Sequence, residues 1–426
     1  MSENKKFYDA IVLGRGPLGL FTSKYLADKK MRILNIDAGH GLNVIKDNIQ
    51  VNSNIDFRDI SHMPSLNTSV TEYSWTGACM GWPRIDIDLI PIDEGDLNKS
   101  EEYVKKSLNM EMFNFGKNLP INLPLSFSQD IIYANILDDV YMSEIQTELS
   151  KSTNYEFAEN LIVKEITEVD KGNVEIECSS YPKNNIIKFQ TKKLFICLGA
   201  IESTRLLLCS KNLNVNRKVL GQNLSNHLTF PISKTLTLNH TETKDRYDYI
   251  NDGKNNKFWP RVILEDSLKE NKRFFVYLTE HKQRSKVLNI GSHKSHIFLE
   301  KKENRESNLT MNGENLEVNF YIDDDELNSI EVIVNEVIDY FKLNKSFFNY
   351  KNFSKKEWIK LIETANHPSG TIRMSDNKSN SVVNKFSHIW NHENIFVFGS
   401  STFPRASFIH PTFPALTFAH YSLKNL

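Results

Sequence analysis

Residues 9–37 read DAIVLGRGPLGLFTSKYLADKKMRILNID, and their pattern is typical of one class of fold. The apolar run Asp9–Leu13 predicts a short buried strand, Leu18–Ala27 predicts a helix, and Arg32–Ile36 predicts a second strand. The pattern G-x-G-x-x-G stands between the first strand and the helix. Its first glycine permits a tight turn, its second lets a pyrophosphate approach the backbone, and its third lets the helix pack closely on the strand.

An acidic residue completes this pattern. Asp37 ends the second predicted strand, where a carboxylate can bind ribose hydroxyls and disfavours a 2′-phosphate. The free N–H groups and the dipole of the helix N-terminus favour the pyrophosphate. We therefore expect a Rossmann-type dinucleotide-binding domain, with FAD or NAD favoured over NADP. The residues expected to bind the dinucleotide here are Gly14, Gly16, Pro17, Leu18, Gly19 and Asp37.

The composition excludes several classes of protein. The chain has 426 residues, long enough for two or three domains, with 52 Lys and Arg against 53 Asp and Glu. This balance argues against a nucleic-acid-binding protein, and no apolar run is long enough for a transmembrane helix. The four cysteines, which show no C-x-x-C spacing, are interpreted as reduced thiols of a cytoplasmic protein: Cys79, Cys178, Cys197 and Cys209.

The remainder of the chain divides into three parts. Three β-type runs between residues 161 and 198 predict a small antiparallel meander, whose last, continuously apolar run predicts a parallel strand. Residues 228–361 mix β-type runs, including 274–278 and 316–321, with a helix-like segment, 325–341, and predict a separate antiparallel sheet with helical support. The end of the chain returns to a strand, 395–398, and a final helix from about Pro414.

Four further blocks carry a more specific pattern. They read HPSGTIRM at 367–374 and GSSTFP at 399–404, the latter followed by HPT at 410–412, with GAIESTRLLL at 199–208 and GQNLSNH at 221–227. In these blocks and their order, the sequence resembles the glucose–methanol–choline (GMC) oxidoreductases, a family of FAD enzymes that oxidise alcohols. The bacterial branch related to pyranose oxidases is the most similar.

The resemblance implies FAD as the cofactor and a way of binding it. The segment YSWT at 73–76 is similar to the branch's x-H-W-T, in which the histidine can be attached covalently to flavin. Ser74 stands at that position, so we expect non-covalent FAD, with Cys79 the only other conceivable point of attachment. The further residues expected near FAD are Trp75, Thr76, Val163, Gly199, Ala200, Gly399, Ser400, Pro411 and Thr412.

Two histidines are the candidates for catalysis. An alcohol that loses hydride must also lose its hydroxyl proton, and a neutral imidazole suits a base near neutral pH. By the resemblance, His367 matches the family's base, and His410 matches the residue that holds the substrate oxygen. His227 matches a position that most often packs the interdomain joint. No metal is expected, because the H-x-x-H of His293 and His296 lacks further ligands and is interpreted as a solvated β-loop.

The predicted fold is α/β: a Rossmann-type FAD domain from residues 1–80, 155–227 and 362–426, interleaved with a substrate domain from 81–154 and 228–361, built on an antiparallel sheet. The predicted reaction is oxidation of an alcohol by hydride transfer to flavin N5, with a sugar or a sugar-like CH–OH group as the favoured substrate. Oxygen, a quinone or a carrier protein all stay open as the electron acceptor. Two alternatives stay open as well: a lyase or isomerase that keeps FAD without redox turnover, and a flavin-free binding protein.

Overall fold

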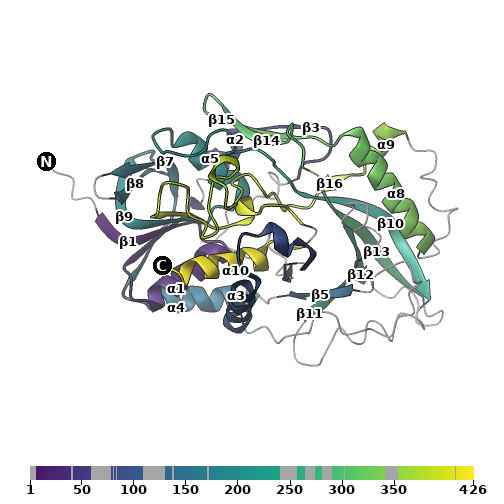
Figure 1. Ribbon diagram of the computed structural model, residues 1–426, viewed down its shortest axis with the longest axis horizontal. Coiled ribbons are helices and arrows are strands. Elements are labelled where there is room, and N and C mark those ends of the chain that lie inside the picture. Colours follow the sequence, from purple (N-terminus) through teal and green to yellow (C-terminus); the bar gives the residue numbers. More distant parts are fainter. Residues whose placement is uncertain are drawn as a thin grey trace.

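The computed structural model describes the chain over residues 6–39, 42–58, 78–79, 81–82, 84–108, 130–136, 139–169, 172–239, 257–263, 274–280, 290–301, 303–340, 354–407 and 409–426. Two large sheets and one small one account for its strands, and helices cover their faces (Figure 1).

The first sheet is a parallel sheet with an antiparallel extension. Its strands β6 (Tyr155–Ala158), β2 (Ile33–Ile36), β1 (Lys6–Leu13), β9 (Ile186–Ile196) and β17 (Ile395–Val397) pair in parallel in that order. Strands β7 (Leu161–Val169) and β8 (Asn173–Ser180) join the first half of β9 in antiparallel fashion. The antiparallel meander and the parallel strand expected between 161 and 198 are thereby confirmed.

Helices cover this sheet because its strands are apolar on both faces. Helix α1 (Pro17–Asp28) packs against α10 (Thr412–Leu423) and α4 (Asp139–Ser150), and α3 (Glu94–Ser107) packs against α10. Their shared core includes Val12, Phe195, Phe396, Phe413 and Leu416. Helix α5 (Gly199–Cys209) packs against β7.

The second sheet is antiparallel. Its order is β16 (Glu363–Thr364), β10 (His227–Asn239), β13 (Ile290–Glu300), β12 (Phe274–Glu280), β11 (Lys257–Ile263), β5 (Asp130–Ile136) and β4 (Ala78–Cys79). His293 and His296 lie within β13, paired with β10 and β12, so the interpretation of this segment as a β-loop is wrong.

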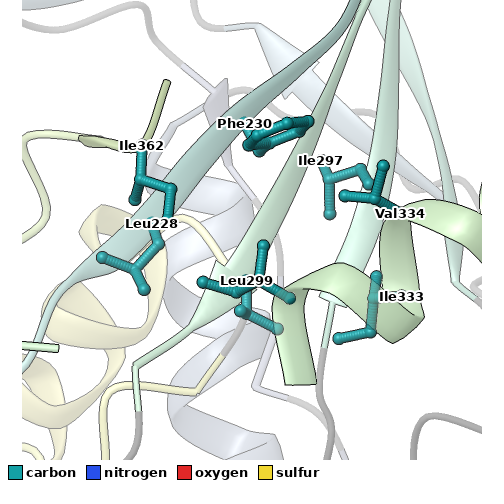
Figure 2. A pocket seen from close by; sticks show the side chains of 8 residues that line it. Leu228, Phe230, Ile297, Leu299, Ile333, Val334 and Ile362 are labelled. Carbon is teal, nitrogen blue, oxygen red and sulfur yellow. The ribbon is translucent and has the colours of Figure 1, made fainter. Parts of the chain in front are cut away.

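Helix α8 (Asp324–Tyr340) covers one face of this sheet, with α9 (Lys355–Ile359) beside it (Figure 1). A small pocket between α8 and the strands is lined by apolar side chains only, among them Leu228, Phe230, Ile333 and Val334 (Figure 2). Because successive side chains of a strand point to opposite faces, Leu228 and Phe230 face α8 while His227 faces away from it. The pocket is therefore a packing gap, on the other side of β10 from the histidines.

The third sheet consists of β14 (Asn308–Asn312), β15 (Asn315–Phe320) and β3 (Ile49–Ser53). The run 316–321 was expected in the antiparallel sheet, but β15 instead pairs in parallel with β3, from the beginning of the chain. Shorter helices complete the description: α2 (Leu42–Asp47) and the 3₁₀ turns η2 (Arg84–Leu89), η7 (Lys378–Asn380) and η8 (Ser400–Thr402).

The expected fold class, a Rossmann-type domain with a second, antiparallel sheet, is confirmed. The domain boundaries stay a prediction, and α3 and α4 of the range 81–154 pack on α10 and α1 of the first sheet. All four cysteines lie in the described part of the chain and are free thiols. Within the described residues, no helix has the length and apolar character needed to cross a bilayer.

Candidate active site

The turn between β1 and α1 is shaped by its three glycines. A Cβ atom on Gly14 would lie 2.5 Å from the carbonyl oxygen of Cys197, and one on Gly19 would lie 2.0 Å from that of Gly14. These two positions therefore require glycine for packing. A Cβ atom on Gly16 would meet nothing within 4 Å. The open space at Gly16 is what the approach of a pyrophosphate to the backbone requires.

The neighbouring strand β2 holds this turn in place. The buried Asn35 donates its amide N–H to the carbonyls of Val12 at 2.9 Å and Gly14 at 2.8 Å. Asp37 accepts the backbone N–H of Arg15 at 3.0 Å, and the Arg15 guanidinium lies 4.1 Å from the ring centre of Phe157. The carboxylate predicted to bind a ribose thus stands directly beside the glycine turn.

Two more turns open with glycine at the carboxyl ends of neighbouring parallel strands. Gly199 follows β9 by three residues and begins α5, and Gly399 follows β17 by two residues and precedes η8. A Cβ atom on Gly199 would meet nothing within 4 Å, and one on Gly399 only the hydroxyl of Ser401 at 3.8 Å. Together with Gly16, these positions leave space along the edge of the sheet where doubly wound folds bind nucleotides.

The helices that begin at this edge have uncapped N-termini. Helix α1 begins with Pro17 and Leu18, α5 with Gly199 and the buried Ala200, and α10 with Thr412 after Pro411. None of the three has a side-chain hydrogen bond at its N-cap. Their free N–H groups and dipoles favour anionic groups. The open glycine turns and these helix ends fit a dinucleotide such as FAD.

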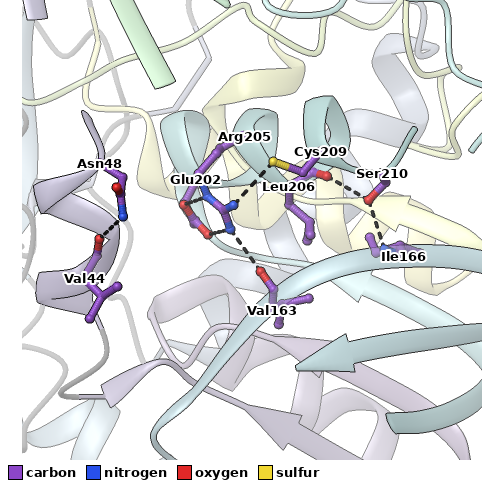
Figure 3. Close-up of polar contacts among 9 residues, drawn as sticks. All are labelled: Val44, Asn48, Val163, Ile166, Glu202, Arg205, Leu206, Cys209 and Ser210. Atoms are coloured by element: carbon purple, nitrogen blue, oxygen red, sulfur yellow. Dashed lines mark hydrogen bonds and ion pairs between the residues drawn. The ribbon is translucent and has the colours of Figure 1, made fainter. Parts of the chain in front are cut away.

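Val163 is placed differently from the glycine turns. Its side chain is buried, and its carbonyl accepts a hydrogen bond from Nη2 of Arg205 at 3.0 Å (Figure 3). Arg205 also binds Glu202 through two hydrogen bonds, of 2.7 and 2.5 Å. Burial opposes the charge of Arg205, but the contacts with Glu202 outweigh it and raise the pKa of the guanidinium. The arginine ties α5 to β7 at the position predicted to contact FAD.

The loop that carries His367 is held between two other motif segments. Ser369 and Ser225 exchange backbone hydrogen bonds of 3.1 and 2.9 Å. On the other side, the hydroxyl of Ser400 donates to the carbonyl of Pro368 at 2.7 Å. The segments 221–227, 367–374 and 399–403, far apart in the sequence, thus form one unit at the joint of the first and second sheets.

Three histidines meet in this unit. Nδ1 of His227 lies 2.8 Å from Nδ1 of His367, and the rings of His367 and His410 have centroids 5.2 Å apart and lie at 88° to each other. His367 is half-buried, whereas His410 and His227 are only 7% and 2% exposed. Burial lowers the pKa of His227 to about 4. The two predicted catalytic residues are therefore neighbours, with His227 behind His367.

The backbone that carries these histidines is fixed by one amide. The buried Asn226 accepts, through Oδ1, the backbone N–H of His227 at 2.8 Å and that of His367 at 3.0 Å. Three of these relationships were not predicted from the sequence: the role of Asn226, the contact of His227 with His367, and the hydrogen bonds of Asn35 to the glycine turn. The only signal in the sequence was that Asn226 and His227 stand side by side in the block GQNLSNH.

Some of the predicted residues lie outside the described residues, namely Ser74, Trp75 and Thr76. Cys79 is buried, and desolvation raises the pKa of its thiol well above the ordinary range. A protonated, buried thiol is a poor nucleophile and hence a poor point of attachment for flavin. Within the described ranges, no group of three or more His, Cys, Asp or Glu side chains could hold a metal ion.

Comparisons with known proteins agree with this geometry. Residues 305–419 match the family model described as GMC oxidoreductase. A search of curated proteins by sequence found no match. The whole chain resembles solved structures at low sequence identity, which establishes the fold alone.

Two of these structures illustrate the similarity. Pyridoxine 4-oxidase from Mesorbium loti has a TM-score of 0.61 and 12% identity, with 98% of each chain covered. A formate oxidase from Aspergillus oryzae RIB40, studied for its FAD modification, has a TM-score of 0.58 and 12% identity, with 99% of this chain and 98% of that chain covered.

FAD is the cofactor of the GMC family, so the family comparison supports the predicted cofactor. The predicted resemblance to the GMC oxidoreductases is confirmed by the family model over residues 305–419, and the chain shares its fold with the solved oxidases over nearly their full length.

Proposed function

We propose that this protein is an oxidoreductase that binds FAD non-covalently and oxidises the CH–OH group of a small alcohol. The observation that carries the proposal is the pair His367 and His410, whose rings lie 5.2 Å apart at the joint of the two large sheets. Two imidazoles at this separation can both reach a single hydroxyl oxygen placed between them. Such a pair provides a base and a hydrogen-bond donor for the same oxygen.

The residues proposed to hold FAD form a continuous edge. Gly14, Gly16 and Gly19, with the start of α1, would hold the pyrophosphate, and Asp37 would hold the ribose. Gly199, Gly399 and the start of α10 would line the flavin half. Trp75, Thr76 and Val163 stay predictions as residues that contact FAD. When bound, FAD supplies a two-electron acceptor that takes hydride at N5.

The two histidines are proposed to handle the hydroxyl group of the alcohol during its oxidation. His367 takes the hydroxyl proton of the alcohol as the O–H bond breaks, and the C–H bond gives its electron pair to the acceptor as hydride. The carbon–oxygen bond becomes a carbonyl, so that one proton and one hydride leave each alcohol. His410 donates a hydrogen bond to the oxygen, which lowers the energy of the developing alkoxide. This hydrogen bond and the base together orient the C–H bond.

The substrate is proposed as a neutral alcohol, with sugars and polyols tested first. The two solved oxidases are named for formate and for pyridoxine, so both compounds belong in the panel as well. The electron acceptor is proposed to be oxygen, a quinone or a carrier protein. The four free thiols fit a reducing compartment, and we propose the cytoplasm.

The test is anaerobic mixing of the FAD-loaded protein with D-glucose, glycerol, benzyl alcohol, pyridoxine and formate, while the flavin absorbance is followed. Bleaching by at least one alcohol supports the proposal. His367→Ala should slow that reduction by about 10²- to 10⁴-fold, the usual contribution of a general base. A protein that is colourless after incubation with FAD would contradict the proposal, as would turnover of a compound without any change in flavin absorbance. Acid precipitation should leave all flavin in the supernatant.

A further inference from the structure

Three observations concern the side of His367 that faces His227. Nδ1 of His367 lies 2.8 Å from Nδ1 of His227, and Nε2 of His227 lies 2.7 Å from the carbonyl oxygen of Ser407. The rings of His227 and His367 stand nearly perpendicular, at 80°. The two imidazoles and the carbonyl therefore form one chain of hydrogen bonds leading from the loop before His410 to the proposed base.

The direction of these bonds follows from counting protons. A carbonyl oxygen can only accept, so Nε2 of His227 must carry a hydrogen. If His227 is neutral, its Nδ1 then has a lone pair and must accept. The hydrogen between the two Nδ1 atoms consequently belongs to His367. His367 is left with its lone pair on Nε2, the nitrogen that does not face His227.

The surroundings of His227 keep it neutral. Its side chain is 2% exposed, and burial lowers its pKa to about 4. The titratable group in direct contact with it is His367, and a positive charge on His367 would further disfavour one on His227. Glu300 and Arg405 approach the same loop, but they bind each other at 2.8 Å and so largely offset their charges.

Ser407 is held so firmly that it can serve as a fixed acceptor. Its N–H donates to Glu300 at 2.6 Å and its hydroxyl donates to the buried Asp86 at 2.9 Å. Its φ of 58° lies in the left-handed region, which a serine adopts only when its surroundings impose it. With N–H, hydroxyl and carbonyl all bonded to different segments, Ser407 fixes the position of His227 through its carbonyl.

We propose that His227 is a positioning residue that locks His367 in the tautomer with hydrogen on Nδ1 and the basic lone pair on Nε2. This inference rests on the proposed function for its consequence in catalysis, although the tautomer itself can be observed without turnover. Free imidazole in water exchanges between two tautomers, and only one has its lone pair on Nε2. When His367 takes up the substrate proton on Nε2, its Nδ1–H remains bonded to the neutral Nδ1 of His227. This hydrogen bond stabilises the charged imidazole of His367.

Two substitutions separate the two contacts of His227. An asparagine amide reaches the place of Nδ1, and a glutamine amide reaches the place of Nε2. His227→Asn can therefore still accept from His367 but loses Ser407, whereas His227→Gln can still donate to Ser407 but loses His367. Both variants keep a polar group in the buried site, so their melting temperatures serve as the check on folding.

The first arm of the test is the rate of flavin reduction as a function of pH, with the alcohol that reduces the wild type fastest in the panel above. His227→Gln should lower the plateau rate by about 10- to 100-fold, as the loss of the hydrogen-bond partner of a metal-ligating histidine does. It should also shift the kinetic pKa of the base downward. His227→Asn should retain most of the rate and the wild-type kinetic pKa. Equal effects of the two variants, or an unchanged pH profile in His227→Gln, would overturn the proposal.

The second arm reads the tautomers directly and needs no substrate. In the FAD-loaded protein labelled with ¹⁵N-histidine, long-range proton–nitrogen NMR spectra distinguish a protonated from an unprotonated ring nitrogen. We expect His227 to carry its hydrogen on Nε2 and His367 to carry its hydrogen on Nδ1. The signals of each histidine are assigned by their disappearance from the spectrum of the variant in which that histidine is replaced. Hydrogen on Nε2 of neutral His367 would refute the proposal even if alcohols are oxidised. If no alcohol reduces the flavin, the proposed function fails, and this arm still decides the tautomer.

Discussion

The amide of Asn35 donates to the carbonyl of Gly14 at 2.8 Å, so strand β2 braces the turn that begins at the end of β1. The same amide donates to Val12 at 2.9 Å, and its oxygen accepts from the hydroxyl of Tyr155 at 3.2 Å on β6. One buried side chain therefore connects three parallel strands at the edge where the dinucleotide is proposed to bind. The glycines allow the backbone of the turn its unusual conformation, and the hydrogen bonds of Asn35 hold it there.

Asn35→Ala is expected to destabilise the protein and weaken FAD binding. The change removes the buried amide donor from the carbonyls of Val12 and Gly14, which costs about 1–3 kcal/mol in the free energy of unfolding. Chemical denaturation of the apoprotein measures this loss, and titration with FAD measures the affinity. Asn312→Ala, which removes only an exposed side-chain hydrogen bond to Glu317 in the β14–β15 hairpin, is the matched control and should change the stability by less than about 0.5 kcal/mol. Equal effects of the two changes would refute the role given to Asn35.

Gly14 and Gly16 are expected to respond differently to the same methyl group. Gly14→Ala places a Cβ atom 2.5 Å from the Cys197 carbonyl and strains a φ of 93°, so the variant should be destabilised by about 1–3 kcal/mol or more. Gly16→Ala meets open space at an ordinary φ of −70°, so its apoprotein should melt like the wild type.

Gly16→Ala should weaken FAD binding even though it leaves the stability of the apoprotein unchanged. A methyl group there occupies the space into which the pyrophosphate is proposed to approach, and we expect a loss of about tenfold or more, equivalent to about 1.4 kcal/mol. Quenching of flavin fluorescence on binding provides the measurement. If Gly16→Ala binds FAD with wild-type affinity, the proposal that the pyrophosphate lies against this turn is wrong.

The stability of the protein should fall as the pH is lowered through the range in which His227 titrates. The pKa of His227 is lowered to about 4 in the folded state, below its ordinary value of 6.5, so only the unfolded chain binds the proton between these values. Stability is therefore complete above about pH 6.5 and is progressively lost towards pH 4. The expected loss from this group between about pH 7.5 and pH 5 is about 2 kcal/mol.

Denaturation of the apoprotein at these two pH values tests this expectation. His227→Asn removes the titrating group, so the difference in stability between the two pH values should shrink by about 2 kcal/mol. The comparison within each variant cancels any loss of stability that the substitution causes at both pH values. An unchanged difference would show that His227 binds protons equally well in the folded and unfolded protein.

The sequence predicted the elements that depend on local patterns. The strand, turn and helix of residues 9–37, the meander after Leu161 and the last helix all have a clear periodicity or a glycine signal, and all are found close to the expected bounds. The motif residues Gly199, His367 and Gly399 could be named as site residues because the GMC resemblance supplied their roles.

The relationships that the sequence did not predict all join distant segments. The pairing of β15 with β3 joins residues about 270 positions apart, and no local pattern distinguishes it from a strand of the larger sheet. The contact of His227 with His367 depends on the pairing of Ser225 with Ser369, which brings two loops together. A resemblance transfers the role of a motif residue, but it does not say which atom of that residue faces which neighbour.

His410 should tolerate asparagine better than alanine. Its proposed task is to donate a hydrogen bond to the substrate oxygen, and an asparagine amide can make the same donation. Loss of one such donor usually lowers the rate by about 10²- to 10³-fold, so His410→Ala should slow anaerobic flavin reduction by that factor while His410→Asn retains most of the rate. His392→Gln is the matched control, because that buried histidine contacts Asn214 and Glu168 on the meander side of the first sheet and should leave reduction unchanged. If the flavin is reduced as fast in His410→Ala as in the control, while reduction is slowed in His367→Ala, another group holds the substrate oxygen. The role proposed for His410 would then be wrong, and the role of His367 would stand.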